Sequence, residues 1–381
     1  STDAAAYHYA TKLMGRPLDF TLTSVEATAR PGTALTIRAE AAVNDKPVRV
    51  QLLGEPLTAL LQRPGGPWQT LALEARGDDI HLNATGSVAR PLAATGFDIR
   101  YQLSTAEINT LVPLQGAFSL SGHYADHPDH HLFDELKVTL GSSDIGGRVI
   151  VYQDEQRPRL VASLDAGRIH LDDILPVNAG DTRAAANWDQ PLDIAGLGIV
   201  DLDVDIRVRQ LEGLAKPLQD SQLGARAGGQ TLALAPLQGT LDGILLDARV
   251  QLPWGERLTD MDKDGVSVQR LLQQADVTLS ASSPDGELRY QTTIAGQALN
   301  LGLSGLEASA GPGERLQVSA GALLDEVPFK VTLQAEPLAQ LLQRPTGPWR
   351  HLSAELHGGD IRVQAGGSVD KPLEARGFNV D

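Results

Sequence analysis

The sequence predicts a mainly β fold: a long, curled antiparallel sheet that forms an open apolar groove, with a few short helices at its edge. Three observations lead to this prediction. Apolar and polar residues alternate over many segments, as they do in strands with one dry and one wet face. Glycine and proline interrupt these segments about every dozen residues, which is typical of an antiparallel meander. Aromatic residues make up only 4% of the chain, so its apolar surface is thin and aliphatic.

The clearest strand is predicted over residues 200–209. Its apolar positions are Val200, Leu202, Val204, Ile206 and Val208, and charged residues stand between them. Weaker alternation predicts further strands at Ile80/Leu82/Ala84, Leu136/Val138/Leu140, Leu160/Ala162/Leu164, Leu299/Leu301/Leu303 and Phe329/Val331/Leu333. Each would place its apolar set on one face of the sheet.

Helical pattern is scarce and short. Residues 56–62 predict a two-turn helix, with Pro56 suited to its first turn and Pro64 ending it. Residues 337–343 are its copy, and residues 105–111, 171–175 and 268–274 are further candidates. Such helices are too few to cover a long sheet.

The chain contains a long internal repeat. Residues 15–100 align with 296–381 at a constant offset of about 281 positions and without a gap, the kind of self-similarity that indicates extended architecture. Between Glu55 and Arg100, 25 residues of 46 are identical to their partners. The second copy stops at Asp381 where the first runs on, so we expect the chain to be part of a longer one. The predicted division is 1–14 as a lead-in, 15–176 as the segment with the first copy, 177–295 as a middle segment and 296–381 as the second copy.

Charge and composition exclude several classes of protein. The formal net charge of −16 opposes nucleic-acid binding, which needs basic residues on the phosphate backbone. There is no cysteine, and therefore no disulfide, thiol nucleophile or cysteine zinc site. No segment approaches the roughly 18 uninterrupted apolar residues of a membrane span. The first residues lack a signal-peptide pattern, so we expect any anchor or export signal to lie upstream.

A sheet with a continuous apolar face must bury that face. It can pack on a second sheet, close into a barrel, or curl around an apolar ligand. A lining of alanine, leucine and valine suits the third solution, and a sandwich core remains an equal alternative.

Several blocks of the sequence resemble AsmA-family proteins. They are Pro113 to Gly122, then Leu140 to Arg148, Arg157 to Leu160, Leu171 to Leu175, Leu202 to Ile206 and Gln230 to Gly239. The single motifs are degenerate, but they occur in the family's order and span nearly the whole chain from about Gly15.

The resemblance implies a Gram-negative envelope protein in the periplasm, held in the inner membrane by an N-terminal helix that this sequence lacks. Such proteins resemble bridge-like lipid-transfer proteins, whose curled sheet conducts phospholipid acyl chains towards the outer membrane. The implied partners are phospholipid acyl chains, the inner membrane and outer-membrane or other envelope proteins. No nucleic acid is expected.

The best candidates for a lipid-groove lining are the apolar positions of the alternating strands. They are Val138, Leu140, Leu160, Leu164, Val200, Leu202, Val204, Ile206, Val208, Leu301 and Leu333. The expected mechanism is passive: an acyl chain exchanges water for an aliphatic lining, and uniform weak affinity lets it slide.

Two segments contain metal-ligand residue types. Asp260, Asp262 and Asp264 form the first half of a calcium loop, but Leu271 stands where the bidentate acid belongs, so an acidic surface loop is favoured. His123, His127, His130 and His131 crowd together with Asp126 and Asp129, yet Pro128 and polar neighbours favour a solvated hairpin loop. No metal and no cofactor is therefore expected.

The pairs Trp68/Trp349 and Arg63/Arg344 recur in both copies. We expect each tryptophan to clamp the short helix before it onto the sheet edge, and each arginine to cap the helix carbonyls. A binding role is the alternative.

No nucleophile elbow, phosphate-cradling glycine loop or zinc-hydrolase helix occurs, so the chain is not expected to be an enzyme. The leading hypothesis is a periplasmic lipid-binding and lipid-transfer protein that supports outer-membrane biogenesis. The first alternative is a structural or adhesive β-repeat envelope protein without a lipid conduit. A metal-dependent enzyme built on the histidine loop is the third class.

Overall fold

The computed structural model describes residues 7–13, 16–30, 32–63, 65–110, 114, 116–153, 157–174, 191–192, 200–213, 216–257, 266–283, 288–294, 297–324, 327–344, 347–371 and 376–380. Two compact units make up the chain. One unit is Ser1–Arg183 with Ile206–Ala215, and the other is Ala184–Asp205 with Lys216–Asp381. The predicted fold class is confirmed, because the described residues are mostly β and form curled, open antiparallel sheet with a few short helices.

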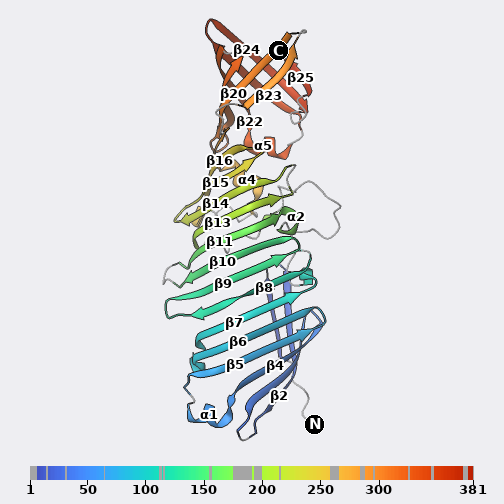
Figure 1. The fold of residues 1–381 in the computed structure, drawn as a ribbon, viewed down its shortest axis with the longest axis vertical. Coiled ribbons are helices and arrows are strands. Elements are labelled where there is room, and N and C mark those ends of the chain that lie inside the picture. The colour runs from blue at the N-terminus through green and yellow to red at the C-terminus, as the bar shows by residue number, and fades with distance from the viewer. Residues whose placement is uncertain are drawn as a thin grey trace. The chain divides into compact units, whose positions relative to one another are not determined.

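The first unit is an antiparallel meander. Its strands are β1 (Tyr7–Leu13), β2 (Arg16–Thr28), β3 (Ala34–Val43), β4 (Lys46–Pro56), β5 (Trp68–Gly77), β6 (Ile80–Arg90), β7 (Thr95–Thr105), β8 (Phe118–Asp126), β9 (His130–Leu140), β10 (Ser143–Tyr152) and β11 (Arg159–His170). Each pairs with the next along the chain. The sheet curls, so that β2 and β4 pass behind β5 to β7 in Figure 1.

Short helices occur where this meander turns. They are α1 (Leu57–Gln62), the 3-10 helices η1 (Pro91–Ala93) and η2 (Ile108–Thr110), and α2 (Leu171–Ile174). The predicted helix over 56–62 is confirmed, with Pro56 at its N-cap. The predicted helix over 105–111 is wrong in extent, because β7 continues to Thr105 and only one 3-10 turn follows.

The second unit is also built of antiparallel strands. Its strands include β14 (Leu218–Gly228), β15 (Thr231–Leu241), β16 (Ile244–Pro253), β18 (Asp276–Ser282), β19 (Leu288–Ile294), β20 (Gln297–Ala310), β21 (Arg315–Leu324), β22 (Val327–Pro337), β23 (Trp349–Gly358), β24 (Ile361–Lys371) and β25 (Arg376–Val380). Helices α4 (Val268–Gln273) and α5 (Leu338–Gln343) lie between strands, and β12 (Pro191–Leu192) pairs with β17 (Val266–Ser267). The division between the units falls inside β13 (Asp201–Glu212).

The internal repeat is visible in the element bounds. The series β4, α1, β5 and β6 recurs as β22, α5, β23 and β24, with every bound shifted by the offset seen in the sequence. The repeat is therefore a duplicated set of strands with one short helix.

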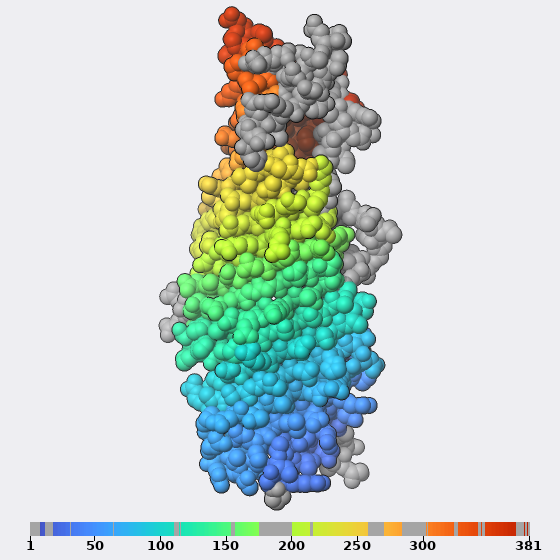
Figure 2. Space-filling model, in the orientation of Figure 1, coloured from blue at the N-terminus to red at the C-terminus, as the bar shows by residue number. Residues whose placement is uncertain are grey.

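The buried core of the first unit is thin. Among the described residues, five of its eleven buried apolar side chains are alanines, including Ala41, Ala75, Ala125 and Ala162, and Val88 is the most deeply buried large one. In the view of Figure 2, the side chains of this unit nevertheless form a continuous surface over the strands. Small residues thus stabilise the sheet without building a thick layer on it.

Candidate functional site

One face of the first unit's sheet carries apolar side chains on successive strands. Leu52 of β4 pairs with Leu73 of β5, and Leu73 pairs with Ala84 of β6. Further along, the pairing runs from Ile99 of β7 through Tyr124, Phe133 and Val149 to Ala162 of β11. Paired positions project to the same face of a sheet, so these side chains form one apolar surface. We call it the apolar face.

The large side chains of the apolar face are only half-buried. Leu52, Leu73, Ile99, Phe133 and Val149 all keep part of their surface exposed. In a sandwich or a closed barrel such residues would be covered, since apolar area left in water costs about 25 cal/mol per Å². In the described part of this unit the apolar face is therefore open.

The opposite face is polar and exposed. Arg100 of β7 donates to Glu135 at 2.6 Å, and Arg148 of β10 donates to Asp134 at 2.9 Å. Each guanidinium holds the pKa of its partner carboxyl below its ordinary value. The sheet is thus two-faced, and only one face suits an apolar ligand.

An apolar pocket of about 310 Å³ lies on the apolar face between β4 and β7. Its lining consists of Leu52, Trp68, Leu71, Leu73, Ala84, Thr85, Gly86, Val88, Pro91, Phe97 and Ile99. The indole nitrogen of Trp68 is buried and has no hydrogen-bond partner among the described residues. Shape and lining suit a hydrocarbon segment.

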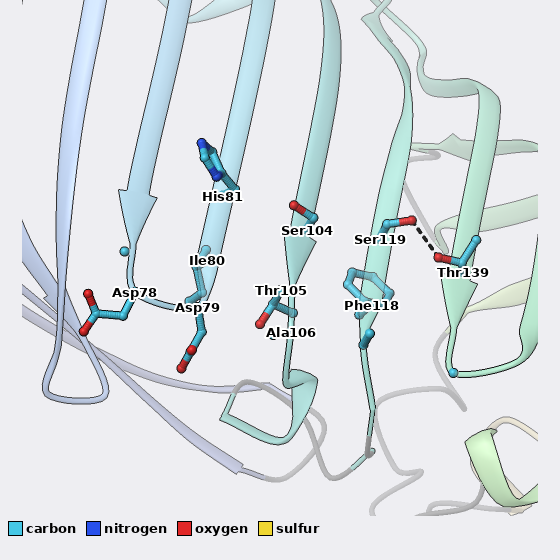
Figure 3. A pocket seen from close by; sticks show the side chains of 13 residues that line it. Asp78, Asp79, Ile80, His81, Ser104, Thr105, Ala106, Phe118, Ser119 and Thr139 are labelled. Atoms are coloured by element: carbon cyan, nitrogen blue, oxygen red, sulfur yellow. Dashed lines mark hydrogen bonds between the residues drawn. The ribbon is translucent and has the colours of Figure 1, made fainter.

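A second hollow, of about 390 Å³, lies at the edge of the same unit and has a different character. Figure 3 shows His81, Ser104, Ser119 and Thr139 in a row across four strands, with Asp78 and Asp79 at the turn below. Ser119 and Thr139 share a hydrogen bond of 2.7 Å. Carboxylates and hydroxyls make this hollow unsuitable for an acyl chain.

A part-buried ion pair fixes the loop after α1 beside the apolar pocket. Arg63 donates to Glu55 at 2.7 Å, and the other carboxylate oxygen of Glu55 accepts the backbone N–H of Gln69. The expectation that the Arg63 side chain caps the helix was wrong. The backbone N–H of Arg63 makes those bonds, to Ala59 and Leu60, because the guanidinium is drawn to the buried carboxylate of Glu55.

The second copy repeats this ion pair. Arg344 donates to both carboxylate oxygens of Glu336, at 3.1 and 3.0 Å. Trp349 donates its indole N–H to the backbone carbonyl of Arg344 at 3.0 Å, so it clamps the end of α5 as predicted. Trp68 makes no such bond and lines the apolar pocket instead.

Three predicted lining residues of the first unit lie on the apolar face. Val138 pairs with Leu120 and Ile145, Leu160 pairs with Val151, and Leu164 pairs with Gly147; all three are half-buried.

Leu140 differs from these three. It is 7% exposed and packs with Ile108, Leu114 and Phe118 in a small core. The turn at η2 covers it, so it supports the sheet edge and offers no ligand surface.

The alternating segment over 200–209 forms β13, but the strand begins at Asp201, one residue later than predicted. Val200 precedes the strand, and its carbonyl accepts the indole N–H of Trp254 at 3.0 Å. Leu202, Val204 and Ile206 are half-buried, whereas Val208 is buried.

The polar positions of β13 are paired across the sheet. Arg226 of β14 contacts Asp203 at 2.6 Å and Asp205 at 2.8 Å. The predicted alternation thus separates an apolar set from a charged set.

The remaining candidates lie in the second unit. Leu333 of β22 is half-buried and pairs with Val318 and Ala354. Leu301 lies in β20, opposite Leu324. The pairing of Leu333 gives this unit a short apolar row of its own on β21 to β23.

The weak calcium candidates, Asp260, Asp262 and Asp264, lie outside the described residues. Within the described chain, no group of three or more histidine and acidic side chains is placed to hold a metal ion.

The histidine segment forms the predicted hairpin between β8 and β9, and each of three histidines has an acidic neighbour. His123 contacts Asp98 at 2.7 Å, and His130 contacts Asp129 at 2.8 Å. His131 lies 3.2 Å from Asp126. These contacts spread the histidines over separate carboxylates.

Two features of the site were missed in the sequence. Phe97 and Val88 line the pocket, and the only sequence feature that marked Phe97 was the Gly-Phe pair shared by both copies. The other feature is a partial cover in the second unit, where Trp254 and Leu271 pack against Leu202, Ala227 and Leu232. There Leu202 and Leu232 are partly covered, and Ala227 is buried.

Comparisons with known proteins found no matching family model, no matching curated protein and no matching solved structure. None of the helices among the described residues has the length and hydropathy needed to cross a membrane.

Proposed function

We propose that the chain is a lipid-binding and lipid-transfer protein of the AsmA type, which shields phospholipid acyl chains on the apolar face of its sheet. The observation that carries the proposal is the apolar face with its half-buried Leu52, Leu73, Ile99, Phe133 and Val149, opposite a polar, ion-paired face. The AsmA-like sequence blocks support a periplasmic location, an inner-membrane anchor and a role in outer-membrane biogenesis.

The mechanism would be passive burial. A hydrocarbon chain lying on the apolar face removes its own surface and that of the half-exposed leucines from water. The pocket beside Trp68 and Phe97 has room for only part of an acyl chain, so many weak contacts along the apolar face would hold the rest. Weak and repeated contacts favour sliding over tight capture.

Site-specific photocrosslinking in cells tests this proposal. A photoreactive residue at Leu73 or Ile99, on the apolar face, should attach to lipid. The same residue at Asn83 or Gln102, on exposed positions of the opposite face, should not. Mass spectrometry of the adducts identifies the lipid, and equal labelling of both faces would refute the proposal.

The alternative is a structural β-repeat protein whose apolar surface is covered by its own chain. The cover formed by Trp254 and Leu271 favours it for β13 to β15. The substitution Val204→Asp distinguishes the structural protein from the lipid-transfer protein. If Val204 lies in a structural core, the variant should unfold; if it lies in a lipid groove, the variant should stay folded and lose its bound lipid. Circular dichroism and native mass spectrometry of the same sample give both readouts.

A further inference from the structure

Over the strands β2 to β7, the two edges of the first unit differ in charge; the next turn on the first edge, β8–β9, carries Asp126 and Asp129. The turns β2–β3, β4–β5 and β6–β7 lie on one edge, because successive turns of an antiparallel meander alternate between edges. Residues 27–39, 56–73 and 84–97, which contain these turns, include no aspartate or glutamate, although the whole chain has 48. Each turn carries one arginine, namely Arg30, Arg63 and Arg90. We call these three turns the arginine edge.

The opposite edge of the same unit is acidic. Its turns contain Asp45, Asp78, Asp79 and Glu107. Figure 3 shows Asp78 and Asp79 projecting beyond the strand ends there. Lys46 pairs with Asp79 at 2.6 Å, which leaves the edge with an excess of negative charge.

The arginine edge also exposes large apolar side chains. Leu61 of α1 is 69% exposed, Leu92 of η1 is 80% exposed and Leu57 is 40% exposed. The two helices are neighbours, since the Gly66 turn after α1 lies against Ala89 and Pro91. Trp68 and Pro91 connect this edge to the apolar pocket.

The second copy is a natural comparison for this edge. It has Glu314, Asp370 and Glu374 where the first copy has Thr33, Ala89 and Ala93. Its helix α5 also packs against α4. The repeated backbone therefore does not require these positions to be free of acids, because the described part of the second copy accommodates Glu314 and Asp370.

We infer that the arginine edge docks on an anionic lipid bilayer. Leu57, Leu61 and Leu92 enter the interface, and Arg30 and Arg90 meet lipid phosphates, an arrangement typical of interfacial membrane binding. Arg63 is already paired with Glu55 and holds the turn in place. Docking would bring the apolar pocket to the membrane surface. The inference does not depend on lipid occupying the apolar face.

Vesicle flotation tests the inference. The full chain should float with vesicles of equal parts phosphatidylglycerol and phosphatidylcholine, and less with phosphatidylcholine alone. The binding should be reversible and weaken with salt, with an association constant on the order of 10⁴ M⁻¹.

The variant Thr33→Glu/Ala89→Asp/Ala93→Glu installs the acids of the second copy and should reduce binding at least ~5-fold. The control Asn83→Asp/Gln102→Glu/Thr139→Glu adds the same charge at exposed positions of the strands and should bind like the native chain. Leu61→Asn/Leu92→Asn should also lose binding, with an unchanged circular dichroism spectrum.

Failure of the native chain to bind either vesicle overturns the inference, and so does an equal loss in both triple variants. Retained binding by Leu61→Asn/Leu92→Asn would also overturn it. If the true partner of this edge is a protein and not a bilayer, the native chain should bind neither vesicle, which is the first of the outcomes that overturn the inference.

Discussion

Ser143 donates its hydroxyl hydrogen to Asp173 at 2.7 Å and thereby ties α2 to the turn between β9 and β10. The same carboxylate oxygen accepts the backbone N–H and the hydroxyl of Ser142, both at 3.0 Å. The Ser143 oxygen in turn accepts the backbone N–H of His170. A short helix of four residues is thus held to the sheet by one carboxylate.

We expect Asp173→Asn to destabilise the first unit by about 1–2 kcal/mol, because hydrogen bonds to a charged acceptor are stronger than those to an amide. Urea unfolding followed by circular dichroism measures the loss. Asp172→Asn is the matched control, since the Asp172 side chain is 74% exposed. Equal effects of the two variants would contradict the role given to Asp173.

Stability should fall in mild acid. Burial alone would raise the pKa of Asp173, but hydrogen bonds from Ser143 and Ser142 outweigh it and hold the pKa below its ordinary 3.8. Burial also opposes ionisation of Glu336, yet the Arg350 backbone N–H and Arg344 hold its pKa below 4.5.

Both folded-state pKa values are lowered, so these carboxylates stabilise the fold above their unfolded pKa values and lose that contribution as pH falls through the folded values. The melting temperature should therefore drop below about pH 5. The Asp173→Asn/Glu336→Gln double variant should show a flatter profile than the native chain between pH 5 and pH 3, and an equally steep profile would contradict the assignment.

Gly86 lies in the floor of the apolar pocket and leaves no room for a side chain. A Cβ added there would lie 1.9 Å from the carbonyl oxygen of Asp98 on the next strand. We expect Gly86→Ala to separate β6 from β7 and to cost about 3 kcal/mol. Gly54→Ala, whose added Cβ would have no neighbour within 4 Å, should change the free energy of unfolding by less than about 0.5 kcal/mol.

The ion pair of Glu55 and Arg63 should contribute to stability although it lies at a sheet edge. The Glu55 side chain is only 9% exposed, so Glu55→Gln leaves a guanidinium without its countercharge and should cost about 1–3 kcal/mol. Glu26→Gln, at an exposed position, should be silent in the same denaturation experiment. If Glu55→Gln left the free energy of unfolding unchanged, the ion pair would contribute nothing measurable to stability.

Local pattern was enough to predict the strands and the short helices of this chain. Strict alternation predicted the start of β13 to within one residue, and the Pro-Leu segment predicted α1. The strand positions of Val138, Leu160 and Leu164 followed from the same period, because two-residue alternation is a property of the strand itself.

The failures depended on contacts between residues distant in sequence. Leu140 has the pattern of a lining residue, but η2 returns across it. Trp254 covers Leu202 from more than one strand away, and the guanidinium of Arg63 turns to Glu55. Such outcomes are decided by which segments meet in three dimensions, and a local pattern carries no information about that.

The half-exposed apolar face also has a thermodynamic consequence. Folding of the first unit leaves part of its aliphatic surface in water, so unfolding exposes less new apolar surface than it does in a thick-cored domain of the same length. The heat capacity change of unfolding should then lie below the usual ~12–15 cal/mol/K per residue, and the curve of stability against temperature should be broad and flat. Bound hydrocarbon would restore the missing heat capacity, which makes scanning calorimetry with and without lipid a direct measure of how much of the face is covered.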